Sequence, residues 1–182
     1  MFHFKRLLRE LSYDKLARLT LFFAVALLLV FFVDTASAFA GTLTVSDSST
    51  GNSIAVRGQT HVADILRLYA SPPDTVTVTD ITVRQNGTAL DSDISLVKLI
   101  SDTNGNGVID IGEPVLASTT TAGNTAQFSA LNLNISPDTT ATLLVAFDIS
   151  SSATLGNTVQ STIQYNVDPS LSDIKVDVAS TV

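Results

Sequence analysis

The sequence predicts an all-β domain, a Greek-key β-sandwich of about eight or nine short strands, preceded by an N-terminal hydrophobic signal helix. β-branched and small polar residues dominate the chain after residue 40, whereas Lys and Glu are scarce and no long helical pattern occurs. Apolar and polar residues alternate over several short runs. Turn signals separate these runs at intervals of about 8–12 residues, which is typical of β-sandwiches.

The first 40 residues have the three parts of a secretory signal peptide. Basic residues gather in 1–18, an apolar run of 15 residues occupies 19–33, and small residues form Ala36-Ser-Ala38 and Ala38-Phe-Ala40. A membrane span needs about 20 apolar residues, so we expect cleavage, with the site after Ala40 favoured. An uncleaved membrane anchor is the alternative, because the basic region is long for a cleaved signal.

We expect a short N-terminal strand and linker at 41–58 and the sandwich at 59–182. Thr42–Val45 reads as the short strand, and the polar residues Ser46–Asn52 read as its linker. His61–Ala70 is compatible with a helix, but Pro72-Pro73 ends it and a buried strand is the better interpretation.

Further along the chain, Thr75–Arg84 alternates apolar and polar residues, as a strand with one solvated face does. The most apolar run, Thr140–Ile149, is expected at the centre of a sheet. Most acidic residues are Asp, which suits turns, and turns are expected at Asp47, Asp74, Asp91, Asp93 and Asp138. The remaining strands are expected at Ile94–Ser101, Val115–Thr121, Ala126–Ile135 (one strand or two), Val159–Val167 and Ile174–Val178.

Charge and cysteine content restrict the possible functions. Residues 1–40 hold five of the ten Lys and Arg and three of the 17 Asp and Glu. The remaining chain therefore has five basic and 14 acidic residues, a net charge of −9, which argues against nucleic-acid binding and suits a protein that gathers cations. The chain has no cysteine, so a bound ion would have to replace the disulfides common in exported domains.

One twelve-residue loop carries the strongest functional signal. It reads Asp102-Thr-Asn104-Gly-Asn106-Gly-Val108-Ile-Asp110-Ile-Gly-Glu113 and fills every position of an EF-hand calcium loop. Side-chain oxygens fall at positions 1, 3, 5, 9 and 12, and position 7 offers a backbone carbonyl. A polar Asn-Gly hairpin turn is the alternative, but such a turn needs no acid at positions 9 and 12. The expected ligands of one calcium ion are Asp102, Asn104, Asn106, the Val108 carbonyl, Asp110 and Glu113.

The surroundings of this loop differ from those of an EF-hand. Gly107 occupies position 6, where the backbone turns sharply, and Ile109 at position 8 is expected to point into a core. Pro114 follows the loop at once and a β-prone run comes next, so the loop is expected to join two strands. Only one copy is present. We therefore expect a structural ion rather than a calcium-triggered helix movement.

The stretch Val97–Leu116 resembles the strand–calcium loop–strand unit of bacterial and archaeal surface proteins. It is similar to the loop of the B-type repeats of serine-aspartate-repeat adhesins, and His61–Ile149 also resembles Ig-like modules of large exported proteins. The resemblance implies an Ig-like fold, a structural ion, and a role in a stalk, an adhesive module or a fibre. This chain departs from those families in having one module and no visible C-terminal anchor, so a fragment of a longer repeat protein is a further interpretation.

No catalytic motif is found, and the sequence predicts a non-enzymatic protein. The part after residue 40 has one histidine, His61, and Asp91 with Asp93 reads as a turn or as an auxiliary calcium ligand. We expect a secreted or cell-surface structural or adhesive module with calcium as its partner, no nucleic acid, and membrane contact only through 19–33. One alternative is a self-assembling pilus or matrix-fibre subunit that donates strand Gly41–Asp47 to another copy. The other is a carbohydrate-binding accessory module, which the absence of Trp disfavours.

Overall fold

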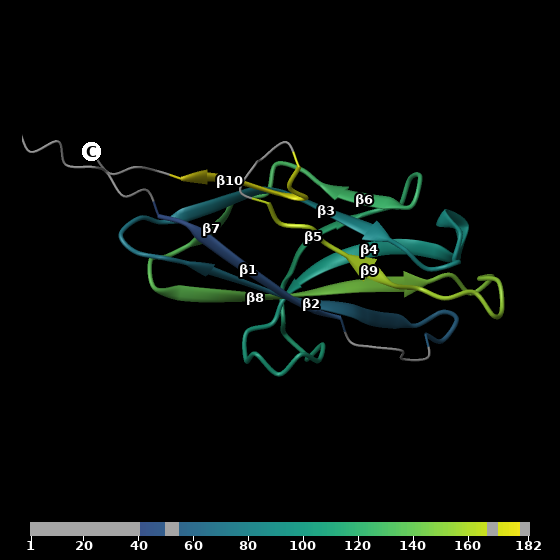
Figure 1. Ribbon diagram of the computed structural model, residues 1–182. Coiled ribbons are helices and arrows are strands. Elements are labelled where there is room, and N and C mark those ends of the chain that lie inside the picture. The colour runs from purple at the N-terminus through teal and green to yellow at the C-terminus, as the bar shows by residue number, and fades with distance from the viewer. Residues whose placement is uncertain (1–40, 50–54, 167–170, 179–182) are drawn as a thin grey trace, which may run out of the picture. The chain divides into compact units, whose positions relative to one another are not determined.

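The computed structural model describes residues 41–49, 55–166 and 171–178. The predicted signal segment 1–40 lies outside the described residues, so its cleavage stays a prediction. The described residues form ten β-strands and one short 3-10 turn, η1 (Asp91–Asp93). The prediction of an all-β fold is confirmed, and the strands form two packed antiparallel sheets (Figure 1).

The first sheet, sheet A, has five strands in the order β1-β2-β8-β4-β5. They are β1 (Leu43–Ser49), β2 (Thr60–Ala70), β8 (Thr139–Ile149), β4 (Ile94–Ser101) and β5 (Val115–Thr119). Strand β8 is central, as predicted from its apolar sequence. It pairs with β2 along one edge and with β4 along the other, and β2 and β4 do not pair with each other in sheet A.

The second sheet, sheet B, is built around β3 (Val76–Gln85). One edge of β3 pairs with β10 (Ile174–Val178) and β9 (Ser161–Thr162). The other edge pairs with β6 (Thr125–Phe128) and β7 (Leu133–Ile135). At most three strands therefore lie side by side in sheet B, with two short strands following one another along each edge of β3.

The main core lies between the two sheets, where alternate residues of facing strands point inward. From β8 the residues Leu143, Val145 and Phe147 enter this core, and each is at most 1% exposed. The intervening Leu144 and Ala146 point to the outer face of sheet A, where they are equally buried. Because β8 is covered on both faces, its sequence is continuously apolar rather than alternating.

A second, smaller apolar cluster lies on the outer face of sheet A. Leu144 and Ala146 pack there with Ile100 of β4, and the partly buried Val62 and Ile65 of β2 pack against them. We call these five residues the outer cluster. Strand β4 ends at Ser101, directly after Ile100, and the predicted calcium loop follows, so the outer cluster lies beside the base of that loop.

Two predicted elements were wrong in extent. Val159–Val167 was expected to be one strand, but among its described residues, 159–166, only Ser161–Thr162 form a strand. The Gln164 N–H donates to the Asp173 carboxylate (3.0 Å) instead of to a strand. Strand β1 continues to Ser49, so Asp47 lies in a strand and not in a turn. Strand β2 offers β1 an unbroken row of backbone partners, which outweighs the polar character of the expected linker.

Candidate metal centre

The predicted calcium loop connects β4 to β5, and no helix follows it, as predicted. The two strands pair antiparallel from Val97 with Thr119 to Ile100 with Val115. At the base of the loop the Ser101 N–H donates to the Pro114 carbonyl (2.9 Å), and the Asp102 N–H donates to the carbonyl of Thr142 in β8 (2.9 Å). The loop projects from the sandwich beside β2 and β8 (Figure 1).

Asp102 is the centre of the loop's hydrogen-bond network. The residue is 5% exposed. Its Oδ1 accepts hydrogen bonds from the backbone N–H groups of Gly105 (2.6 Å) and Asn106 (3.2 Å), and its Oδ2 accepts one from Gly107 (2.8 Å). Three backbone donors thus converge on one carboxylate. This arrangement fixes the tight turn of the first half of the loop around the side chain at position 1.

The two asparagines link the middle of the loop to Asp110. The Oδ1 of Asn104 accepts from the Asn106 N–H (3.0 Å), and the Oδ1 of Asn106 accepts from the Val108 N–H (2.8 Å). Both Nδ2 groups donate to the same Oδ2 of Asp110, each at 2.7 Å. These two bonds, with that of Asn104 first, lower the pKa of Asp110 below its usual value, because they favour the charged carboxylate.

Glu113 ties the last position of the loop to its beginning. Its Oε1 accepts from the Thr103 N–H (3.1 Å), and its Oε2 accepts from the Asp110 N–H (3.0 Å). Both oxygens of the carboxylate therefore face into the loop. All five predicted side-chain ligands, Asp102 to Glu113, lie in one connected network.

The charge of the loop suits a cation, but its carboxylates do not converge on one point in this structure. No Lys or Arg of the described residues forms an ion pair with Asp102, Asp110 or Glu113, so three negative charges share one short loop. The described residues contain no group of three His, Cys, Asp or Glu side chains close enough to hold a metal ion. Instead, the three carboxylates accept hydrogen bonds from backbone N–H groups and from the two Asn amides.

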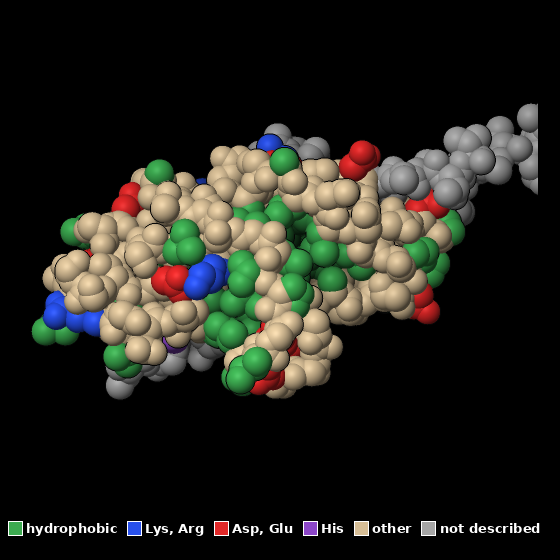
Figure 2. Space-filling view, turned by 180° about the vertical axis from the view of Figure 1, so that it is seen from behind, with side chains coloured by type: hydrophobic (Ala, Val, Ile, Leu, Met, Phe, Trp, Pro, Cys, Tyr) green, Lys and Arg blue, Asp and Glu red, His purple; other side chains and the backbone are tan. Residues whose placement is uncertain are grey.

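The loop backbone rests on the outer cluster at Gly107. A Cβ atom added to Gly107 would lie 2.7 Å from the Cδ1 of Ile65, and the φ angle of Gly107 is +78°. Both observations support the predicted need for glycine at position 6. The prediction for Ile109 was wrong: its side chain is exposed, as are those of Val108 and Ile111. Figure 2 shows the projecting loop with red acidic atoms and green apolar side chains at its surface.

Two other acids singled out from the sequence, Asp91 and Asp93, accept hydrogen bonds from backbone N–H groups. The Asp91 carboxylate accepts from the N–H groups of Gly123 (2.7 Å) and Asn124 (3.1 Å). The Asp93 carboxylate accepts from the N–H groups of Leu90 (2.9 Å) and Thr154 (2.7 Å) and from the Asn157 amide. These bonds lower the pKa of Asp93 to about 2, with that of Leu90 contributing most. The interpretation of Asp91 and Asp93 as turn residues therefore explains the hydrogen bonds that both carboxylates form.

A buried polar cluster that sequence reasoning missed lies at the opposite end of β2 from its Pro-Pro turn. Asp64 is completely buried, and its Oδ2 accepts a hydrogen bond from Ser161 (3.2 Å) of sheet B. Its Oδ1 and the Oε1 of the buried Gln85 have no hydrogen-bond partner among the described residues. Burial raises the pKa of Asp64 above its usual value, and the nearby Asp47 adds to this. The position of Asp64 inside the otherwise largely apolar run His61–Ala70 was the sequence signal that could have indicated this buried acid.

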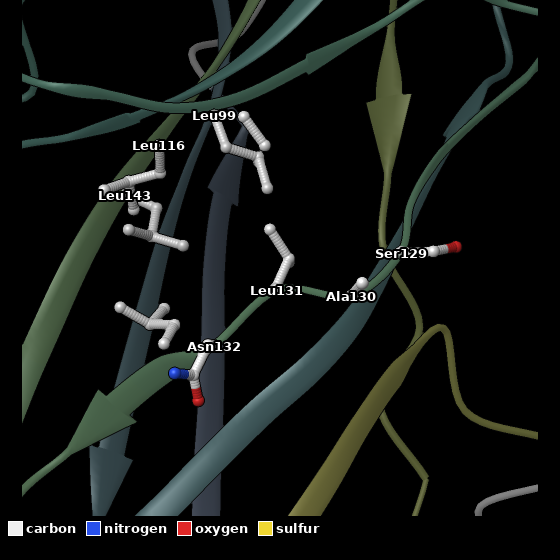
Figure 3. A pocket seen from close by; sticks show the side chains of 9 residues that line it. Leu99, Leu116, Ser129, Ala130, Leu131, Asn132 and Leu143 are labelled. Atoms are coloured by element: carbon white, nitrogen blue, oxygen red, sulfur yellow. The ribbon is translucent and has the colours of Figure 1, made fainter.

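An open groove of about 350 Å³ lies between the edges of the two sheets. Figure 3 shows Leu99, Leu131 and Leu143 pointing toward one another, with Leu116 of β5 beside them. The segment Ser129–Asn132 between β6 and β7 forms the opposite wall. No aromatic side chain lines the groove, so it gives no support to the carbohydrate-binding alternative.

No protein-family model matches the chain, and no curated protein matches it. Among the described residues, no helix has the length and apolar character that crossing a membrane requires. The apolar run 19–33 lies outside those residues. His61, the histidine considered for catalysis, lies part-buried on β2, and burial lowers its pKa.

Proposed function

We propose that the protein is a non-enzymatic, exported structural or adhesive module whose β4–β5 loop binds one calcium ion. The observation that carries this proposal is the loop itself. Its five oxygen-bearing side chains form one network, its three carboxylates have no basic partner among the described residues, and glycine stands where the backbone turns. Hard divalent cations prefer this set of carboxylate, amide and carbonyl oxygens.

The ion would take over the role that the two asparagine amides have in this structure. Their Nδ2 groups put partial positive charge on the Asp110 carboxylate. A calcium ion held by Asp102, Asn104, Asn106, the Val108 carbonyl, Asp110 and Glu113 would supply a full positive charge instead. With three carboxylates and two neutral amides, the affinity should resemble that of extracellular modules, with a Kd of about 10⁻⁴–10⁻³ M.

Calcium should stabilise the fold because the loop is attached to the sandwich at several points. The Asp102 N–H donates to the Thr142 carbonyl of β8, Gly107 lies against Ile65, and the edge strand β5 begins two residues after the loop. At a calcium concentration about 100 times the Kd, binding would add roughly 2.7 kcal/mol to the free energy of unfolding. For a domain of this size that is a rise of about 8 °C in the melting temperature.

Calorimetry in EDTA and in millimolar calcium tests the proposal. Asp102→Ala and Glu113→Gln should each remove most of the calcium-dependent rise in melting temperature. Asp177→Asn is the matched control, because Asp177 is an exposed acid on β10, outside the loop. Its substitution removes the same charge and should leave the rise intact. Equal melting temperatures of the wild type in EDTA and in calcium would contradict calcium binding.

We also propose that the sandwich is an Ig-like Greek-key module. Two features of the connections support this topology. The chain crosses from sheet A to sheet B between β2 and β3 and again between β5 and β6. Strand β8 then returns to sheet A and lies between β2 and β4. Strand exchange in such modules is a known route to fibres.

The position of β1 favours self-assembly as a second candidate function. Strand β1 is an edge strand that pairs with β2 over seven residues within its own chain, and Leu43 is buried in the core. The same seven pairs would form if β1 of one copy added to β2 of another. Light scattering on the mature protein with and without residues 41–50 tests this, and monomers in both cases at high concentration with calcium would exclude donation.

A further inference from the structure

The candidate calcium loop contains two asparagines that are each followed by glycine. Asn104-Gly105 and Asn106-Gly107 lie within four consecutive residues, and Asn86-Gly87 is a third such pair among the described residues. An Asn-Gly pair is the sequence most prone to deamidation. The reason is steric, because glycine has no Cβ to hinder attack by its backbone nitrogen on the side chain of the preceding asparagine.

Both attacking nitrogens of the loop are engaged by one carboxylate. The Gly105 N–H donates to the Oδ1 of Asp102 (2.6 Å) and the Gly107 N–H to its Oδ2 (2.8 Å). Attack requires the nitrogen to lose its proton. Asp102 opposes this step in two ways, since it holds the N–H as a donor and places a negative charge beside the developing anion.

The leaving groups are engaged as well. The Nδ2 groups of Asn104 and Asn106 each donate to the Oδ2 of Asp110 at 2.7 Å. Their Oδ1 atoms accept from backbone N–H groups two residues further on, so the plane of each amide is fixed. In the folded loop, nucleophile and leaving group are therefore held in separate hydrogen bonds.

We propose that Asn104 and Asn106 are deamidation sites whose reaction Asp102 suppresses as long as the loop is folded. The backbone nitrogen of the following glycine forms a bond to Cγ, the bond from Cγ to Nδ2 breaks, and ammonia leaves with the proton from the backbone nitrogen. A succinimide ring remains. Water then opens either C–N bond of the ring and yields aspartate or isoaspartate, with no oxidant or reductant required.

The two products add the same negative charge and differ in what they do to the backbone. Aspartate at position 3 or 5 replaces a neutral ligand by a carboxylate and adds one negative charge to a loop with three. Isoaspartate adds one atom to the backbone and displaces every later position, Asp110 and Glu113 included. The modification would thus mark molecules whose loop has been open. The inference stands on the hydrogen bonds of Asp102 and does not depend on the proposed calcium binding.

Peptide mass mapping of the intact protein during incubation at mildly alkaline pH tests the proposal. In the folded wild type, deamidation of Asn104 and Asn106 should be slower than in urea by about tenfold or more, because a charge-assisted hydrogen bond must open first. Asp102→Ala should accelerate both sites in buffer toward their rates in urea. Asn86 is an internal control: its Nδ2 donates to Thr162 (2.6 Å), away from Asp102.

Each outcome decides for or against the proposal. Equal rates for the loop sites in buffer and in urea would overturn the protection, and an unchanged loop rate in Asp102→Ala would overturn the role of Asp102. Selective acceleration at Asn104 and Asn106 supports it. If Asn86 accelerates too, the variant has unfolded, and Asp102→Asn, which keeps the shape of the side chain without its charge, then decides by the same comparison of Asn104 and Asn106 with Asn86.

Discussion

Replacing Gly107 by alanine tests whether the loop truly rests on the sandwich. The new Cβ would lie 2.7 Å from the Cδ1 of Ile65 and 3.8 Å from its Cγ1, at a backbone φ of +78°. Gly105 is a matched control, because its φ is +71° and nothing lies within 4 Å of an added Cβ. The two substitutions share their backbone strain and differ in the contact with Ile65.

The expected magnitudes follow from the shared backbone strain and from the contact with Ile65. A left-handed backbone costs alanine about 1–2 kcal/mol, of which roughly 0.4–1 kcal/mol is offset by the stiffer unfolded chain. Gly105→Ala should therefore lower the free energy of unfolding by about 0.5–1 kcal/mol. Gly107→Ala must also move Ile65 away from its preferred rotamer, at a further cost of about 0.5–1.5 kcal/mol.

Urea unfolding of a double-mutant cycle isolates the contact. Ile65→Val removes Cδ1, the atom nearest to the added methyl, and on its own costs about 0.5–1.5 kcal/mol. Combined with Gly107→Ala it should cost less than the sum of the two single changes, whereas with Gly105→Ala the costs should add. Equal destabilisation by the two alanines, together with additivity in both pairs, would refute the packing of the loop on Ile65.

Three further predictions concern pH and processing. Asp93 has a pKa of about 2, below its usual 3.8, so its contribution to stability is present above the usual value and lost as the pH falls through about 2. Urea unfolding between pH 5 and 2 should therefore show a shallower loss of stability in Asp93→Asn. Asp64 has a raised pKa, which gives the opposite sign: its charged form is disfavoured, and stability declines as the pH rises through its folded-state pKa. Asp64→Asn should be more stable than the wild type at neutral pH by the same unfolding assay, and a less stable variant would show that the charged form is tolerated. N-terminal sequencing of exported protein should find Gly41 first, and a retained 1–40 segment in the membrane fraction would establish an anchor instead.

Most strand positions could be predicted because alternation and turn residues are local signals. Thr75–Arg84 alternates cleanly, and the structure places β3 one residue further along. Ile94–Ser101 coincides with β4. Even the ambiguous His61–Ala70 is strand β2, since Pro72 and Pro73 stop any helix. Such local patterns reflect which face of a strand meets the core.

The pairing of elements was out of reach because it depends on distant partners. Nothing around Ser46–Ser49 indicates that β2 would hold those polar residues in a strand. The burial of Asp64 depends on Ser161, 97 residues away. Ile109 was expected to point into a core because of its place at position 8, but its side chain is exposed in a loop that joins two strands. Within the loop, local spacing singled out the residues Asp102 to Glu113, which the structure joins in one hydrogen-bond network, whereas their calcium binding stays a proposal.

The central place of β8 determines when this domain can fold. Sheet A consists of a β1-β2 part and a β4-β5 part, and only β8, at residues 139–149, connects them. During synthesis the two parts have no common partner within sheet A until most of the chain has been made. Pairings across such long sequence separations make folding slow, in the range of milliseconds to seconds. The topology therefore keeps the two parts of sheet A apart until residues 139–149 have been made.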